Sequence, residues 1–211
     1  MALQTLTRLY DDHDDAVHVV QALEQAGVPH ADISLVANNA DTRYDANGTT
    51  GTGVTSGDPA QGASTGGGTG ASLGTILGGG AGLLAGLGML AIPGVGPIVA
   101  AGWLVATLTG AGIGAAAGGL FGSLTGAGVS EADAQPYAEG VRRGGNLVTV
   151  RTDETMAGTV DAVLDGRTPV NPVARRAEYE QEGWKGFDPA APAYTTEQVV
   201  TERKRRVVSV S

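Results

Sequence analysis

The stretch Leu73-Gly74-Thr75-Ile76-Leu77-Gly78-Gly79-Gly80-Ala81-Gly82-Leu83-Leu84-Ala85-Gly86 carries a glycine at every fourth position. On a helix, where each residue advances about 100°, these glycines gather on one side and the bulky aliphatic residues on the other. A face of nearly bare backbone lets two helices approach closely. The stretch therefore predicts a helix that packs through its glycines and leaves an aliphatic face to be covered.

The same four-residue spacing continues on both sides of a central break, Ile92-Pro93-Gly94-Val95-Gly96-Pro97. We expect Pro93, Gly94, Gly96 and Pro97 to form the turn of a hairpin. The expected helix-packing seam consists of the small residues that keep the register: Gly70, Gly74, Gly78, Gly82, Gly86, Gly102, Ala106, Gly110, Gly114, Gly118, Gly122 and Gly126. Residues 71–128 are thus interpreted as an antiparallel glycine-zipper helical hairpin.

This hairpin requires a partner. Each interior glycine costs a helix about 1 kcal/mol relative to alanine, so neither arm is expected to be stable alone in water. Leu83, Leu87 and Leu90 belong to the aliphatic face that needs a cover. Lipid is one cover, because arms of about 21 to 30 residues exceed the roughly 20 that span a hydrocarbon core. Hairpins of neighbouring copies, sharing one apolar core, are the other.

Composition limits the classes of partner. The net charge is −9, whereas nucleic-acid binding depends on basic surfaces. No charged residue or histidine occurs from residue 59 to residue 130, a run of 72 residues that holds 23 of the 35 glycines. The absence of cysteine excludes disulfides and thiol chemistry. We therefore expect lipid bilayer or copies of the chain itself as partners, with no nucleic acid and no small-molecule substrate.

The sequences on either side of the uncharged run alternate between strand and helix patterns. The expected parts are residues 1–45 as the first half of an α/β domain, 46–70 as a Gly/Thr/Ser linker, 129–173 as the second half, and 174–211 as a charged C-terminal extension. Strands are predicted at residues 3–10, 33–37 and 147–151. Each half offers too few strands for an independent sheet. The predicted fold is therefore a small α/β sandwich, ferredoxin-like or related, interrupted by the long hairpin.

Several segments resemble the bacterial heat-induced general stress protein family. They are residues 87–97, Ala115-Ala116-Ala117-Gly118-Gly119-Leu120, Tyr137-Ala138-Glu139-Gly140-Val141-Arg142-Arg143-Gly144-Gly145 and Glu182-Gly183-Trp184. The resemblance covers roughly residues 5–192 and implies a glycine-zipper hairpin inside a small α/β domain, an association with stress, and membrane contact. It supplies no catalytic residues, and the basic tail after Thr195 looks like a local extension.

The motifs that could carry chemistry are few. Asp14 and His18 stand four residues apart and could form one pair of metal ligands, but the sequence offers no second cluster to complete a shell. We therefore expect Asp11-Asp12-His13-Asp14-Asp15 to be a capped, solvated helix start. The uncharged run has no lysine and no phosphate-binding loop, and no serine-histidine motif occurs. No catalytic, metal or cofactor residue is predicted.

The resulting expectation is a non-enzymatic, membrane-associated general stress protein that oligomerises through its hairpin. Its flanking domain would lie in the cytoplasm, since the N-terminus has no long apolar segment of the secretory type. The alternative is a cytoplasmic, self-assembling structural protein. The run Arg203-Lys204-Arg205-Arg206 is interpreted either as a solvated terminal segment or as a site of attraction to anionic lipid.

Overall fold

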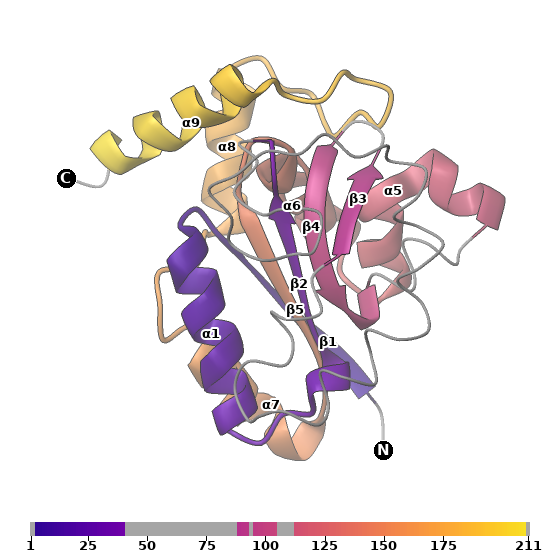
Figure 1. The fold of residues 1–211 in the computed structure, drawn as a ribbon, viewed down its shortest axis with the longest axis vertical. Coiled ribbons are helices and arrows are strands. Elements are labelled where there is room, and N and C mark those ends of the chain that lie inside the picture. Colours follow the sequence, from indigo (N-terminus) through magenta and orange to yellow (C-terminus); the bar gives the residue numbers. More distant parts are fainter. Residues whose placement is uncertain (1–2, 41–87, 93–94, 105–111, 210–211) are drawn as a thin grey trace.

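The computed structural model describes residues 3–40, 88–92, 95–104 and 112–209 (Figure 1). The chain runs through strands and helices in the following order: β1 (Leu3–Tyr10), α1 (His13–Gln25), a 3-10 turn (His30–Asp32), β2 (Ile33–Asn38), β3 (Gly88–Ile92), β4 (Gly96–Gly102), α5 (Gly112–Gly126), α6 (Glu131–Arg142), β5 (Asn146–Asp153), α7 (Glu154–Leu164), α8 (Pro172–Gln181) and α9 (Thr196–Ser209).

Five strands form one sheet in the order β1-β5-β2-β4-β3, and every neighbouring pair is antiparallel. β5 follows the uncharged run in sequence, yet it lies between β1 and β2, which precede that run. In register, Leu6 faces Val150 across β1 and β5, and Leu35 faces Val148 across β2 and β5. The two flanks of the chain therefore share a single sheet.

Helices cover both faces of this sheet, so that the protein has three layers. Side chains alternate between the faces along each strand. In β4, Val99 and Ala101 face the core under α1 and α7, whereas Ile98 and Ala100 face the core under α5 and α6. Both cores consist mainly of fully or nearly fully buried aliphatic residues, with Tyr10 in the first and Tyr137 in the second. The α/β class predicted from the sequence is confirmed.

Local sequence explains how the helices begin. The Asp12 carboxylate accepts hydrogen bonds from the backbone amides of Asp14 and Asp15, and so caps α1. Ser130 caps α6 in the same way, since its hydroxyl accepts from the Asp133 amide and donates to the Asp133 carboxylate. The cap of α1 falls within residues 11–15, the segment that the sequence pattern indicates.

The strand order differs from a ferredoxin-like sheet, in which the first strand is internal, because β1 lies at an edge. The connections nevertheless have the split β-α-β form. β1 and β2 run parallel with β5 between them, and β4 and β5 run parallel with β2 between them. The fold is thus a related sandwich rather than the ferredoxin-like arrangement.

The centre of the expected helical hairpin is corrected by the structure. Residues 88–92 and 96–102 are strands β3 and β4, so the Pro-Gly break joins two strands of the sheet. Gly96 and Pro97 belong to β4, and Pro93 and Gly94 lie outside the described residues. The physical reason is the exposed edge of β2, which offers β4 a full ladder of backbone hydrogen bonds from Ser34 to Asn38.

Of the second expected arm, Gly112–Gly126 is helical as predicted, with a break in helical geometry at Gly119. Its residues Leu120 and Leu124 are fully buried in the core beneath α5 and α6. The expected linker at 46–70 and the first arm up to residue 87 lie outside the described residues. Within the parts of the chain that are described, no helix combines the length and apolar character needed to cross a bilayer.

The C-terminal extension is structured and packs on the sandwich. α8 and α9 bury Arg175, Tyr179, Val199, Glu202 and Arg206. α9 lies across the end of the sheet that is opposite the N-terminus (Figure 1). The interpretation of the basic run as a solvated terminal segment is therefore wrong for Arg206, which is buried, whereas Lys204 and Arg205 are exposed as expected.

Candidate functional site

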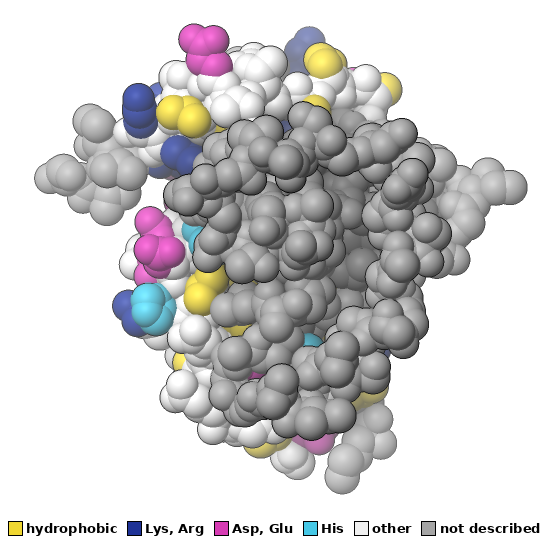
Figure 2. All heavy atoms as spheres, in the orientation of Figure 1, with side chains coloured by type: hydrophobic (Ala, Val, Ile, Leu, Met, Phe, Trp, Pro, Cys, Tyr) yellow, Lys and Arg dark blue, Asp and Glu magenta, His cyan; other side chains and the backbone are white. Residues whose placement is uncertain are grey.

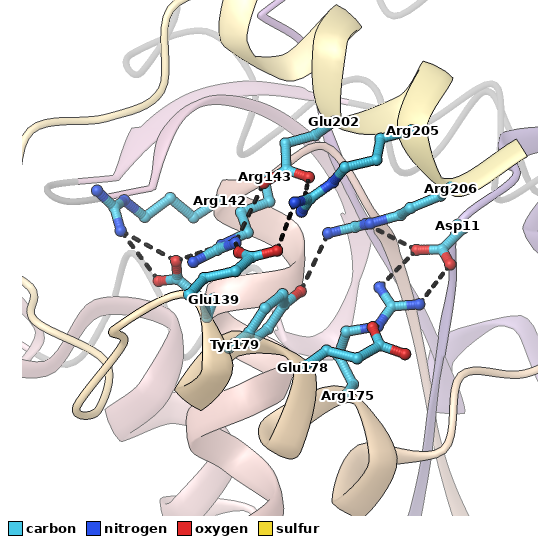
Figure 3. Close-up of polar contacts among 11 residues, drawn as sticks. Asp11, Glu139, Arg142, Arg143, Arg175, Glu178, Tyr179, Glu202, Arg205 and Arg206 are labelled. Atoms are coloured by element: carbon cyan, nitrogen blue, oxygen red, sulfur yellow. Dashed lines mark hydrogen bonds and ion pairs between the residues drawn. The ribbon is translucent and has the colours of Figure 1, made fainter. Parts of the chain in front are cut away.

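A group of charged side chains gathers where the C-terminal end of α6 meets α8 and α9 (Figure 3). Charged residues are rarely buried in proteins unless they are paired. Five at this place are less than a tenth exposed: Glu139, Arg143, Arg175, Glu202 and Arg206. We call these five residues, together with Asp11, Arg142, Tyr179, Glu182 and Arg205, the clamp network.

Arg143 is the first centre of the clamp network. Its Nε donates to Glu139 Oε1 at 2.6 Å, and its Nη1 donates to Glu202 Oε1 at 3.1 Å and to Glu182. The Glu139 carboxylate, which is fully buried, also accepts from Arg142 Nη1. Burial alone would lower the pKa of Arg143, but the hydrogen bonds that it donates to Glu139 and Glu182 outweigh this effect and raise that pKa. The guanidinium therefore remains charged and links α6 to α9.

Asp11 is the second centre, at the turn after β1. Arg175 of α8 grips it with two hydrogen bonds, of 2.9 Å and 2.6 Å, and Arg206 Nη1 of α9 donates to Oδ1 at 2.7 Å. Two-pronged arginine–carboxylate pairs are among the stronger polar contacts in proteins. Burial would raise the pKa of Asp11, but Arg175 and Arg206 outweigh that effect and hold it below its ordinary value.

Tyr179 connects the two centres. It is 1% exposed, and the Arg143 guanidinium lies 4.1 Å from the centre of its ring. Its hydroxyl accepts a hydrogen bond from Arg206 Nη2 at 3.2 Å. The close-up shows Arg206 between this hydroxyl and Asp11 (Figure 3). One aromatic side chain thus makes a cation–π contact with α6 and a hydrogen bond with α9.

α9 also contacts the backbone where β2 ends and β5 begins. Arg203 donates to the Gly144 carbonyl at 3.0 Å and 2.9 Å, and Thr196 donates to the Ala40 carbonyl at 2.6 Å. Gly144 has φ +107, and a Cβ there would lie 2.7 Å from Val199 Cγ1. Glycine at this position therefore permits both the turn after α6 and the approach of α9.

The outer side of α9 carries a shallow depression of about 350 Å³, lined by Tyr194, Glu197, Gln198, Thr201, Glu202 and Arg205. Arg205 and Glu202 already form an ion pair within it, and Arg205 also pairs with Glu182. In the space-filling view, both basic and acidic side chains appear over α9 and over α1 (Figure 2). The chemical capacity of the clamp network is to fasten helices, because its charged groups are engaged with one another.

Five of the predicted seam residues lie in the described structure, Gly102 in β4 and the other four in α5. Gly102 ends β4 with φ +90, and a Cβ there would lie 2.0 Å from the Ile33 carbonyl oxygen. Its glycine is required by contact with β2 and not by a helix seam. Gly122 and Gly126 of α5 have open space where a Cβ would stand.

The remaining seam positions fall into two groups. Gly114 and Gly118 are helical in α5. The others lie outside the described residues: Gly70, Gly74, Gly78, Gly82, Gly86, Ala106 and Gly110.

The acidic start of α1 shows no arrangement for a metal. His18 Nδ1 bonds the Asp14 backbone carbonyl of its own helix at 2.7 Å. In the described part of the chain, no group of three or more His, Asp or Glu side chains is placed to hold an ion. Trp103, which follows β4, packs partly buried against the core under α5 and α6, and its ring faces the Arg151 guanidinium.

Sequence reasoning missed the clamp network, apart from noting the basic run of α9. A usable signal exists within α6, since Glu139 precedes Arg142 and Arg143 by three and four residues, the spacing of helical ion pairs. The pairing of Asp11 with Arg175 spans 164 residues and leaves no local pattern.

Comparisons with protein-family models, with curated proteins and with solved structures find no match to this chain. The architecture and the clamp network therefore have to be interpreted on their own physical terms. Together they describe an α/β sandwich that fastens its C-terminal helices by buried ion pairs, in a chain whose sequence carries a long uncharged insertion.

Proposed function

We propose that this chain is a non-enzymatic packing protein of the kind it resembles among the heat-induced general stress proteins, and that it self-associates through its uncharged insertion. The observation that carries the proposal is that charged residues and the uncharged insertion occupy separate parts of the chain. The charged groups of the clamp network serve to hold the body together. The insertion from residue 59 to residue 130 carries no charge and is glycine-rich.

The anchorage of the insertion supports copies of the chain as the favoured partner. Its middle forms β3 and β4 of the sheet, and α5 buries Leu120 and Leu124 against the body. Residues 98–101 of β4 and the two leucines of α5 are therefore covered by protein. Gly122 and Gly126 lie on α5 with open space above them, which suits the close approach of another backbone. Packing through the glycine register from Gly70 to Gly86, which lies outside the described residues, would add to such contacts.

A bilayer is the second candidate partner. Ser123 and Thr125 support it, because their hydroxyls donate to carbonyls of their own helix, at Gly119 and Phe121. Because these hydroxyls already donate within α5, they do not need water as an acceptor, as is common for hydroxyl side chains in membrane helices. Association with stress and attachment to the cytoplasmic membrane both belong to this version of the proposal.

Flotation with liposomes separates the two partners. The full chain would be mixed with vesicles of neutral or anionic lipid, centrifuged through a density gradient, and sized in plain buffer without detergent. Self-association predicts a discrete complex that stays at the bottom of the gradient. Membrane association predicts flotation that resists alkaline carbonate. A monomer that does not float would contradict both versions.

A further inference from the structure

We propose that α9 is an ionic latch that closes over the base of the insertion and can open while the sheet stays folded. The base consists of Asn38, Asn39 and Ala40, the last described residues before the segment that leads into the insertion. Any effect of this opening on self-association rests on the proposed function. The opening itself does not.

The contact surface of α9 is unusually polar for a docked helix. Among residues 196–206, the buried positions are Val199, Glu202 and Arg206, which share one helical face at spacings of three and four. The buried face of this part of α9 therefore carries one valine and two charged residues. By comparison, α1 buries Ala16, Val19, Val20 and Leu23 under the sheet.

Ionic contacts are what hold this face. Arg206 Nη1 lies 2.7 Å from Asp11 Oδ1, and Arg143 Nη1 lies 3.1 Å from Glu202 Oε1. Apolar burial contributes in proportion to the area removed from water, so a single valine contributes little to docking. Salt weakens ion pairs that are open to water more than buried ones, and α9 holds such open pairs, since the Arg205 side chain, 54% exposed, pairs with Glu182 and Glu202. The docking of α9 should therefore respond to salt far more than the packing of the sheet does.

The position of the latch gives it a consequence. Thr196 at the start of α9 bonds the Ala40 carbonyl at 2.6 Å, and Arg203 Nη2 reaches the Asn38 carbonyl at 3.4 Å. The same Arg203 holds the Gly144 carbonyl, beside the start of β5. When α9 leaves, the base of the insertion loses these contacts, whereas residues 33–37 of β2 keep their ladders to β4 and β5. Regions held by few apolar contacts open at lower free energy than the core.

Amide hydrogen exchange on the full chain tests the latch. Arg206→Gln removes the contact with Asp11, and Lys204→Gln is the matched control, since Lys204 is exposed on the same helix. Exchange would be followed in about 0.1 M and about 1 M salt, between which the Debye length falls from about 10 Å to about 3 Å. We expect Arg206→Gln to speed exchange in α9 and at Asn38–Ala40 at least about tenfold while β5 stays protected. High salt should act in the same direction on the unaltered chain.

Three results would overturn the latch. They are exchange of α9 in step with β5, equal effects of the two substitutions, or opening of α9 with no change at Asn38–Ala40. If Arg206→Gln does not fold, Arg203→Gln provides the same measurement, because Arg203 joins α9 to the base directly. Sedimentation of the same samples reports self-association separately. A chain that stays monomeric would therefore count against the proposed function and leave the exchange result intact.

Discussion

Glu139 shows what a single residue contributes to this fold. Its carboxylate is fully buried and bonds both Arg142 and Arg143. Removing one partner of a buried ion pair costs about 3–5 kcal/mol, because the other charge stays buried without compensation. We expect Glu139→Ala to lower the free energy of unfolding in urea by about that amount.

The control for this substitution is Glu180→Ala. Glu180 pairs with Arg176 at 3.7 Å, and its side chain is 54% exposed. Exposed pairs contribute about 1 kcal/mol or less. Equal losses of stability in the two variants would contradict the assignment of Glu139 to a buried network.

Gly102 and Gly122 distinguish two explanations for the glycine register. Gly102 has φ +90 and touches the Ile33 backbone, so Gly102→Ala should destabilise the fold by at least about 1–2 kcal/mol, the cost of a left-handed residue. Gly122 lies in helix α5 with open space, so Gly122→Ala should stabilise by up to about 1 kcal/mol. Thermal unfolding of dilute protein measures both. A destabilising Gly122→Ala in the monomer would contradict the described environment of α5.

At the scale of elements, the pH dependence of α9 follows from the carboxylates that face it. Burial would raise the pKa of Asp11 and of Glu182, but their arginine partners lower both. These groups are thus more acidic in the folded protein than in the unfolded chain. Their stabilisation is complete above their ordinary values near pH 4 and is lost as the pH falls through their lowered values.

We therefore expect α9 to stay docked from about pH 7 to about pH 5 and to lose protection below about pH 4. Hydrogen exchange, corrected for the intrinsic pH effect, would follow α9 against β5. The variant Asp11→Asn should show a weaker acid dependence of α9. An unchanged acid dependence in that variant would exclude Asp11 as a group that controls docking.

The elements also show how far sequence patterns reach. The alternation of residues 3–10 predicted β1 at Leu3–Tyr10, and the acidic run at residues 11–15 predicted the start of α1 at His13. The helix prediction for residues 88–92 and 96–102 was wrong because short apolar runs fit a helix or a strand equally well. Pairing of β4 with β2 decides between them, and that pairing is a tertiary property. The same holds for Arg175 and Asp11, whose contact depends on how α8 docks.

At the scale of the whole molecule, the sheet joins the strands before the uncharged run with the strand after it. β1 and β2 both pair with β5, and β5 lies between them. A fragment of residues 1–40 contains two strands with no hydrogen bonds to each other. We expect this fragment to be unfolded alone by NMR and to gain structure when a fragment of residues 129–211 is added. A cooperatively folded fragment 1–40 would contradict the shared sheet.

Self-association through the insertion is the central claim, and sedimentation velocity tests it most directly. The double variant Gly78→Leu/Gly82→Leu fills the predicted seam, and Gly79→Leu/Gly80→Leu makes the same change outside the four-residue register. We expect the unaltered chain and the second variant to sediment as the same oligomer. We expect the first variant to sediment as a smaller species, because its side chains occupy the space that a partner backbone needs. Identical sedimentation of all three chains would contradict assembly through the glycine register.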